Sequence, residues 1–582
     1  MMSEAELAGD HDQPIGDPKE SSLFRSSAIM ALGTTFSRGL GFLRTALLLA
    51  ALGAAGANDA FNVANTLPNV VFNLLAAGLL DAILVPQIVR AFKTKSGSDY
   101  VNRLLTLAGL IMFGITIVMV AAAGILVNLT AGLMAPAWKS LAIVFAIWCL
   151  PQIFFYGIYA LLGEFLNARG IFGPYMWTPA VNNVIAIIGL IVFIAVYGTA
   201  SDVNDPSVWD FQRTALLAGP ATLGVIAQAL LLIIPLRRAG VRLRLDFHFR
   251  GTGLRRASKI AGWVFATLVV GQVGYLSTSN IAAAANAWST QTGVFAASTA
   301  ALGITFTVYM LPQSIVSVSI ATALFTKIAS AAADGNQASM VRNYQIGVRS
   351  SLLLTMWMAA ILGAAAIPVF QILGPSNPIS EMVAYANALV IILPGLAGAV
   401  VVIFSQRVFY SLEDGRPVFY TVLWPTLGQV ALGWTLMLFL PPVYWLFGAL
   451  FAETVSRIVQ GVVSTYFVRA RLPQANPRVV IGDMVKYGSM AVVSGLLGMG
   501  ALHFVGAFDT SGTVTGAIWG GLWRGVLVAV VVSVGYFSLV ATIDRQNFQT
   551  ALGMLGSRIP YFQRFASAQE DAQAPDSAPG NE

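Results

Sequence analysis

The residues best suited to chemistry are two arginines and one aspartate that lie in otherwise apolar sequence near the start of the chain. Arg38 and Arg44 belong to TTFSRGLGFLRTALLLAALG, and Asp59 follows in GANDAFNVANTLPN. An arginine at bilayer depth is costly and persists where it faces a partner or a watery cavity. Two guanidiniums in low dielectric can bind phosphate bidentately. The pattern indicates an anion site in which Asp59 holds the arginines while the site is empty. The alternative is a structural salt bridge.

Polar side chains continue beyond Asp59 along one helical face, because asparagines recur every three or four residues at Asn62, Asn65, Asn69 and Asn73. A polar stripe on a membrane helix faces protein or water, not lipid. It could join helices by hydrogen bonds, but beside three charged residues a cavity wall is favoured.

Glycine and proline mark the predicted hinges. Gly39 and Gly41 separate the two arginines and permit a bend. Pro68 and Pro86 remove backbone hydrogen bonds from the second predicted span, so we expect that span to be broken, as in helices that line transport pathways. Pro312 follows Leu311 in the eighth span as Pro68 follows Leu67 in the second, which indicates a weak internal repeat.

Composition excludes whole classes of protein. Of 582 residues, 57% are hydrophobic and 10% charged, against about a quarter charged in soluble domains. One cysteine, Cys149, excludes disulfides and thiolate metal clusters, and the histidines (His11, His248 and His503) lie far apart. No phosphate-binding loop for ATP is present. We therefore expect no enzyme activity, cofactor or metal site.

The apolar stretches predict about fourteen transmembrane helices of roughly 20 residues each. With the N-terminus in the cytoplasm, 27 of the 33 lysines and arginines fall on the cytoplasmic side, and only Lys139 and Arg213 fall on the other. Basic loops resist translocation, so both termini are predicted to be cytoplasmic. The same bias explains the net charge of +7, because the basic cytoplasmic loops lie against anionic lipid headgroups. No nucleic-acid partner is needed to explain this charge.

Two more arginines lie within predicted spans. Arg457 follows Glu453 by four residues, so the two side chains share one helical face and form a predicted structural ion pair. Arg524 lies near the start of the last span, where its side chain can extend to the interface.

At the first two spans the sequence resembles a known family. The stretch FSRGLGFLRTALLLAALGAAGANDAFNVANTLPNVVFNLLAAGLLDAILVPQIVRAF is similar to the opening of the MurJ (MviN) lipid II flippases, and FGPYMWTPAVNNVIAI to their fifth span. These flippases belong to the multidrug/oligosaccharidyl-lipid/polysaccharide exporter superfamily. The resemblance implies an all-α membrane protein of about fourteen helices, with two six-helix lobes around a central cavity and a lipid-tail groove beside two C-terminal helices. The implied organisation is a disordered tail (1–21), an N-terminal lobe (22–240), a C-terminal lobe (255–470), two further helices (484–545) and a second tail (546–582).

Some charges of the family are absent here. Phe72 and Asn73 replace the usual Arg-Arg, and Phe306, Thr307 and Met310 replace the Asp-Arg and Glu of the eighth span. The chain resembles actinobacterial members of the family, for which the resemblance implies similar losses. The remaining arginines must then supply most of the pyrophosphate recognition, helped by amides and helix N-termini. The predicted substrate-binding residues are Arg38, Arg44, Asp59, Asn65, Asn73, Gln272 and Asn280.

The resemblance implies a flippase of the bacterial cytoplasmic membrane that moves lipid II, the undecaprenyl-pyrophosphate-linked peptidoglycan precursor, by alternating access for cell wall synthesis. The membrane potential or an unidentified monovalent ion would drive it. The alternatives are an exporter of another polyprenyl-linked sugar and a non-transporting scaffold for wall-synthesis and division proteins.

Overall fold

The computed structural model is helical in all regular elements that it describes. Within these ranges no strand occurs, so the prediction of an all-α membrane protein is confirmed. The described residues are 36–75, 97–168, 171–238, 246, 258–506 and 513–545, apart from Arg38, Phe172 and Ser376. The predicted tails, Arg38 and the predicted hinge Pro86 lie outside them.

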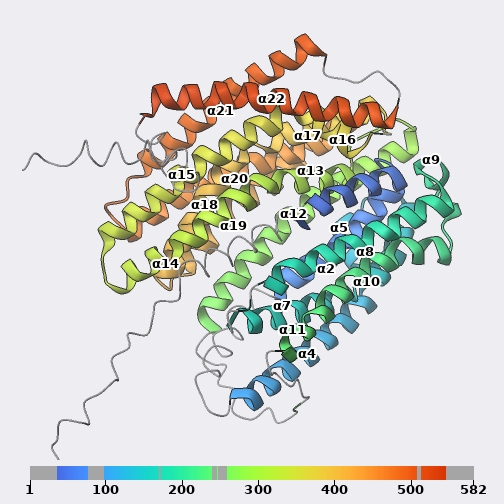
Figure 1. Ribbon diagram of the computed structural model, residues 1–582, viewed down its shortest axis with the longest axis horizontal. Helices are drawn as coiled ribbons and strands as arrows, with labels where there is room; N and C mark the ends of the chain where they lie inside the picture. The colour runs from blue at the N-terminus through green and yellow to red at the C-terminus, as the bar shows by residue number, and fades with distance from the viewer. Residues whose placement is uncertain are drawn as a thin grey trace, which may run out of the picture.

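The first half of the chain forms an N-terminal bundle (Figure 1). Its helices are Gly39–Leu52, α2 (Ala57–Leu75), α4 (Gly97–Ala121), α5 (Ala123–Ala131), α6 (Pro136–Cys149), α7 (Gln152–Ala168), α8 (Gly173–Tyr197), α9 (Ala200–Val203), η2 (Pro206–Val208), α10 (Phe211–Leu231) and α11 (Ile233–Arg238).

The second half forms a C-terminal bundle with two added helices, α21 and α22. The bundle comprises α12 (Ser258–Thr292), α13 (Thr299–Pro312), the π-helix η3 (Gln313–Ser317), α14 (Val318–Ala333), α15 (Gln337–Ala364), α16 (Ala366–Leu373), α17 (Ile379–Ile392), α18 (Gly395–Ser411), α19 (Arg416–Phe439), η4 (Pro442–Tyr444) and α20 (Trp445–Arg471). The added helices, α21 (Pro477–Val505) and α22 (Val514–Ile543), pack along α15 and α16.

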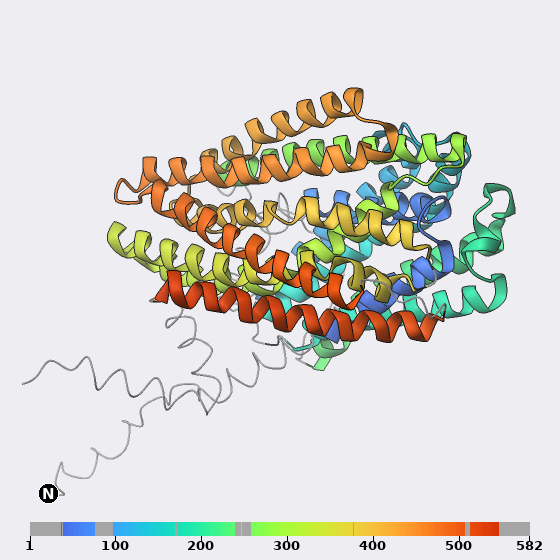
Figure 2. The same cartoon turned by 90° about the horizontal axis from the view of Figure 1, so that it is seen from above.

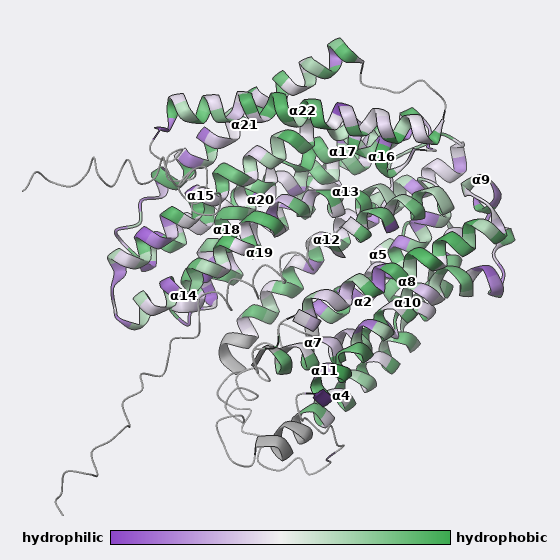
Figure 3. Ribbon diagram, in the orientation of Figure 1, coloured by the Kyte–Doolittle hydropathy of each residue, from purple (hydrophilic) through white to green (hydrophobic). Residues whose placement is uncertain are grey.

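Among the described residues, nine helices are long and apolar enough to cross a membrane, or up to eleven if two bent pairs each count as one span. The bend is 69° between α4 and α5 and 45° between α17 and α18. The other three predicted spans coincide with Gly39–Leu52, which is short, and with α2 and α12, whose polar side chains lower their hydropathy. The count of fourteen stays a prediction. Hydrophobic residues predominate along the helices, and many hydrophilic residues lie toward the helix ends (Figure 3).

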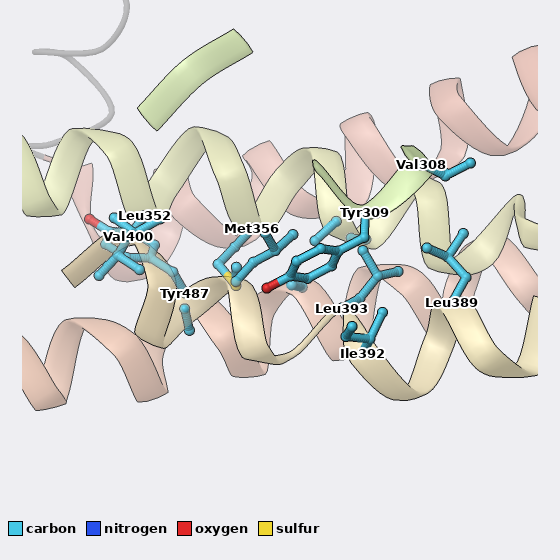
Figure 4. Packing of buried hydrophobic residues seen from close by; sticks show 14 of the residues in the cluster. Val308, Tyr309, Leu352, Met356, Leu389, Ile392, Leu393, Val400 and Tyr487 are labelled. Carbon is cyan, nitrogen blue, oxygen red and sulfur yellow. The ribbon is translucent and has the colours of Figure 1, made fainter. Parts of the chain in front are cut away.

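The buried side chains form separate hydrophobic cores in the two bundles. In the C-terminal core, Tyr309 lies beside Met356 and Leu393 (Figure 4). The helix Gly39–Leu52 contacts both cores, because Leu49 packs into the C-terminal core and Leu52 into the N-terminal one. This first helix is therefore positioned between the bundles.

Among the described residues, the bundles are joined by hydrogen bonds toward one end. The N-termini of α2 and α13 lie together at this end, which we call the closed end. There the Tyr385 hydroxyl of α17 also donates a hydrogen bond to the carbonyl of Ala54, 2.7 Å away. The long helices run roughly parallel (Figure 2), and the bundles diverge toward α4 and α14, which mark the open end (Figure 1).

An ion network attaches the last two helices to the C-terminal bundle. Arg349 of α15 contacts Asp483 of α21 at 3.0 Å, and Lys486 bridges Asp483 to Asp544 at the end of α22. Arg524, near the start of α22, is mostly buried and donates to the carbonyl of Gly506 at 2.7 Å, so it caps the end of α21.

The predicted break at Pro68 is wrong, because α2 continues as one helix through this residue. A proline in a helix removes one hydrogen bond, and the neighbouring turns can retain theirs. Pro312 does mark an irregularity, since the π-helix η3 begins directly after it. Gly39 and Gly41 lie in one described helix, and Gly41 packs next to Asn183 of α8, so the structure gives Gly41 a packing role.

The closest helix contact gives a test of the packing. A Cβ added at Gly398 of α18 would lie 1.9 Å from the carbonyl oxygen of Arg457 in α20, whereas one added at Gly428 of α19 would meet nothing within 4 Å. We expect Gly398→Ala to destabilise the protein by about 2 kcal/mol, since overpacking forces the helices apart. Thermal unfolding in detergent measures this. Gly428→Ala is the control, and equal melting temperatures would contradict the proposed contact.

Candidate functional site

Asp59 joins the two bundles at the closed end. Its carboxylate is fully buried and accepts hydrogen bonds from Asn286 Nδ2 of α12 (2.6 Å), Ser298 Oγ (2.7 Å), Thr299 Oγ1 (2.8 Å) and the backbone N–H of Ala300. All four donors belong to the C-terminal bundle. A buried carboxylate is stable only where such donors replace water, so Asp59 depends on contact between the bundles.

Three of the four donors to Asp59, namely Ser298, Thr299 and Ala300, form the N-terminus of α13. Ser298 is the N-cap residue of this helix, yet its hydroxyl accepts no capping bond and donates to Asp59 instead. The carboxylate, not the serine, accepts the bond from Ala300 N–H and places negative charge at the positive end of the helix dipole. Asp59 thus caps a helix of the opposite bundle.

The prediction that Asp59 holds the arginines is wrong for Arg44, because the hydrogen bonds that its carboxylate accepts from described residues all come from the C-terminal bundle. Arg44 lies eight residues before the end of its helix at Leu52, which corresponds to about 12 Å along the helix axis. The alternative of a salt bridge between the first two helices fails for the same pair. Arg38 lies outside the described residues.

Arg44 faces the interior of the N-terminal bundle and is half-buried. Its guanidinium is within electrostatic range of the Tyr156 hydroxyl of α7 and the Cys149 thiol of α6. Within the described part of the chain it forms no ion pair with an aspartate or glutamate. A cation in this setting has strong affinity for an anion that enters from water.

The asparagine stripe connects these two charges. The Asn69 side chain reaches the same Tyr156 hydroxyl that lies near Arg44. Asn62 and Thr66 line a cavity of about 230 Å³ between the bundles, with Tyr275 of α12 and Phe306 of α13 on its other wall. Asn65 is half-buried and Asn73 is exposed at the far end of the stripe. The polar face of α2 therefore runs along the bundle interface.

The two predicted site residues of α12 have different surroundings. Asn280 donates to the carbonyl of Leu129 at 2.6 Å and accepts from the N–H of Gly132 at 2.9 Å, so its amide caps the end of α5. Both ends of the amide are bonded in this conformation, so its contact with substrate stays a prediction that requires these bonds to open. Gln272 differs, since its buried Oε1 has no partner among the described residues.

The residues that stand in place of the family's charged residues have uncharged side chains. The Phe72 ring stacks near Tyr156 at 5.7 Å between centroids, and Phe306 lies 5.8 Å from the ring of Tyr309. The Thr307 hydroxyl bonds its own helix at Gly303, and Met310 is exposed. None of these four side chains can replace a charge.

Sequence reasoning missed the partners of Asp59 and the neighbour of Arg44. Ser298 and Thr299 directly precede an apolar run, which is the usual signal of a helix N-terminus and could have shown where an anion would bind. Tyr156 carried no such signal, because a lone tyrosine in an apolar span is common. Its position is decided by the packing of α7 on α2.

Comparison with solved structures defines the class of this fold. It is similar to a structure described as "Lipid II flippase MurJ, inward closed conformation", with a TM-score of 0.62, 16% identity, and coverage of 88% of this chain and 100% of the other. An inward-facing multidrug resistance MATE family transporter of the MOP superfamily matches with a TM-score of 0.61 and 16% identity over 77% of this chain and 98% of its own. The fold is that of multi-pass transporters of this superfamily.

The family follows from sequence. A family model described as "Lipid II flippase MurJ" matches residues 48–515, and the chain belongs to this family. Proteins named "Probable lipid II flippase MurJ" are similar to it. The one from Synechocystis sp. is 27% identical over 68% of this chain and 73% of its own length, and the one from Rhizobium tropici is 27% identical over 75% and 79%.

The capping of α13 by Asp59 gives a second prediction. We expect Asp59→Asn to weaken closure by about 2 kcal/mol, because charge-assisted hydrogen bonds are lost and the new amide N–H groups face donors. Spin labels at Phe211 of α10 and Val294, at the closed ends of opposite bundles and in a variant without Cys149, should then show a larger population of long distances.

Asp205→Asn is the matched control, because this exposed carboxylate bonds only within its own loop at the same end. Identical distance distributions for Asp59→Asn and the parent would show that the carboxylate does not hold the bundles together.

Proposed function

We propose that this protein translocates lipid II from the inner to the outer leaflet of the bacterial cytoplasmic membrane by alternating access. Membership of the lipid II flippase family supports the substrate. The anionic part of lipid II is its diphosphate, and cationic side chains of the protein would bind it.

The observation that carries this proposal is the charge of Arg44, which has no carboxylate partner among the described residues. A salt-bridged arginine would already be neutralised, and a diphosphate would have to displace its partner. Arg44 instead lies near neutral groups, Tyr156 and Cys149, on a helix that contacts both bundles. Binding an anion there removes an uncompensated charge and couples the substrate to the helix between the bundles. Arg38, Asn65, Asn73 and Gln272 remain proposed contributors.

The distribution of basic residues supports the direction of movement. The described ends of α4, α11, α14 and α20 at the open end belong to segments of the chain rich in lysine and arginine, while Lys139 and Arg213 lie toward the closed end. Basic segments stay in the cytoplasm, so we place the open end and both termini there. The headgroup would enter from the cytoplasm while its polyprenyl tail stays in lipid.

Outward opening requires the closed end to separate. The contacts that must break are those of Asp59 with α13 and of Tyr385 with Ala54. We propose that bound diphosphate draws the first helix and α2 into a new position that releases these bonds. The membrane potential or an ion gradient would supply the driving force, with membrane lipids and wall-synthesis or division proteins as further partners.

The substrate site is tested by Arg44→Ala. We expect its affinity for lipid II to fall on the order of tenfold to a hundredfold, because a hydrogen bond to a charged group contributes about 1.5–3 kcal/mol. Native mass spectrometry of the purified protein measures binding. Arg213→Ala is the control, since this arginine stacks near Tyr197 at the closed end, 5.0 Å from the ring centroid.

The same variants separate a flippase from a scaffold. After depletion of the wild-type protein, a flippase requires Arg44 for growth and for movement of lipid II in proteoliposomes. Normal growth and movement with Arg44→Ala, at wild-type protein levels, would reject the proposed role of this arginine.

A further inference from the structure

A second polar chamber lies inside the C-terminal bundle, away from Arg44. Its volume is about 280 Å³, and four elements besides α12 and α13 contribute to its walls: η3, α18, α19 and α20. Tyr275 and Phe306 line both this chamber and the cavity between the bundles. The two spaces are therefore adjacent, and a molecule between the bundles could extend into the C-terminal one.

Most of the polar side chains that line this chamber are uncharged. Four glutamines contribute to it, together with one ion pair and one threonine: Gln313, Gln406, Gln429, Gln460, Glu453, Arg457 and Thr426. An amide offers both donors and acceptors, so four of them favour a ligand that also carries both. A cluster of this kind in a membrane bundle is costly unless it faces such a ligand or water.

The ion pair makes the chamber electrically neutral. Arg457 donates through Nη2 (2.9 Å) and Nε (3.3 Å), and both bonds end on Oε1 of Glu453, as the sequence predicted for this pair. Within the described part of the chain, no bond uses Glu453 Oε2 or Arg457 Nη1, so one acceptor and one donor remain for a ligand. A diphosphate gains little here compared with Arg44, because Glu453 repels it.

The π-helix brings Gln313 into the chamber. Pro312 lacks an N–H, and the helix widens directly after it at η3. Ser317, at the end of η3, is fixed to α15 by hydrogen bonds of 3.0 Å with Thr355 and with Ser351. Gln313 lines the chamber, and its buried Oε1 has no partner among the described residues. An unpartnered acceptor of this kind is typical of a binding position.

We propose that this chamber binds the first sugar unit of the substrate headgroup through its hydroxyl and acetamido groups, while Arg44 binds the diphosphate. The inference rests on the proposed function and adds a second subsite to it. Hydroxyl and amide groups both donate and accept, which matches the glutamines and the free edge of the Glu453–Arg457 pair. The two subsites lie on opposite bundles, so a ligand that fills both would link them.

The test compares two lipids that differ only in the sugar. Native mass spectrometry measures binding of undecaprenyl diphosphate and of the same carrier bearing one N-acetylated sugar to the full-length protein. We expect Gln313→Leu to weaken binding of the sugar-bearing lipid about tenfold and to change binding of the bare diphosphate by less than about twofold. Arg44→Ala should weaken both.

Gln371→Leu is the matched control, because Gln371 of α16 is also a buried glutamine whose Oε1 lacks a partner among the described residues, yet it lies outside the chamber. If Gln313→Leu does not yield a monodisperse protein, Gln406→Leu carries the same test. Equal effects on both lipids, no effect on either, or the same effect from Gln371→Leu would each overturn the sugar subsite. A chamber that holds only water or a coupling ion would give one of these results.

Failure of this inference differs from failure of the proposed function. If the wild-type protein moves lipid II in proteoliposomes but does not distinguish the two lipids, only the sugar subsite is rejected. If it neither binds nor moves them, the flippase function is rejected as well.

Discussion

The structure depends on one buried carboxylate. Asp59 belongs to the N-terminal bundle, but its hydrogen-bond donors among the described residues all belong to the C-terminal one. The buried carboxylate is stabilised by a helix N-terminus and three side chains, which replace the water that it loses. The arrangement holds the bundles together only while they touch, because a separated Asp59 needs water and a separated α13 loses its cap. The contact is therefore suited to two alternative states, one closed and one hydrated.

The charged residues of the membrane region fall into two kinds. Asp59 is hydrogen-bonded by its neighbours and the charges of Glu453 and Arg457 neutralise each other, whereas Arg44 has no carboxylate partner in the described part of the chain. Satisfied charges contribute to structure and specificity, and an unsatisfied one contributes affinity for a ligand. The same distinction applies to the amides. Asn280 is used in capping α5, while Gln272 and Gln313 retain buried acceptors without partners.

The helix between the bundles connects these features. Its Leu49 and Leu52 pack into different cores, and Arg44 lies one to two turns before them. It ends at the turn whose Ala54 carbonyl is bonded by Tyr385. A movement of Arg44 would therefore shift the turn with Ala54, which takes part in the closed end. On the C-terminal side, α13 is capped by Asp59 at one end and passes into the π-helix at the other. The interface helices of both bundles thus connect the closed end to a polar site.

The sequence by itself determined the class of protein, the helix positions and the Glu453–Arg457 pair. Hydropathy, charge bias and four-residue spacing are local properties that do not depend on which helices become neighbours. It also identified Arg44 and Asp59 as unusual, since a charge in an apolar stretch is visible without a structure. Their partners were not predictable. Asp59 bonds residues more than 220 positions away, and Asn280 bonds residues about 150 positions away. Only the packing of the helices decides which polar groups meet, because a membrane helix can rotate or shift without changing its hydropathy. The continuity of α2 through Pro68 and the widening after Pro312 were decided in the same way, by neighbours that satisfy or disturb the backbone on each side.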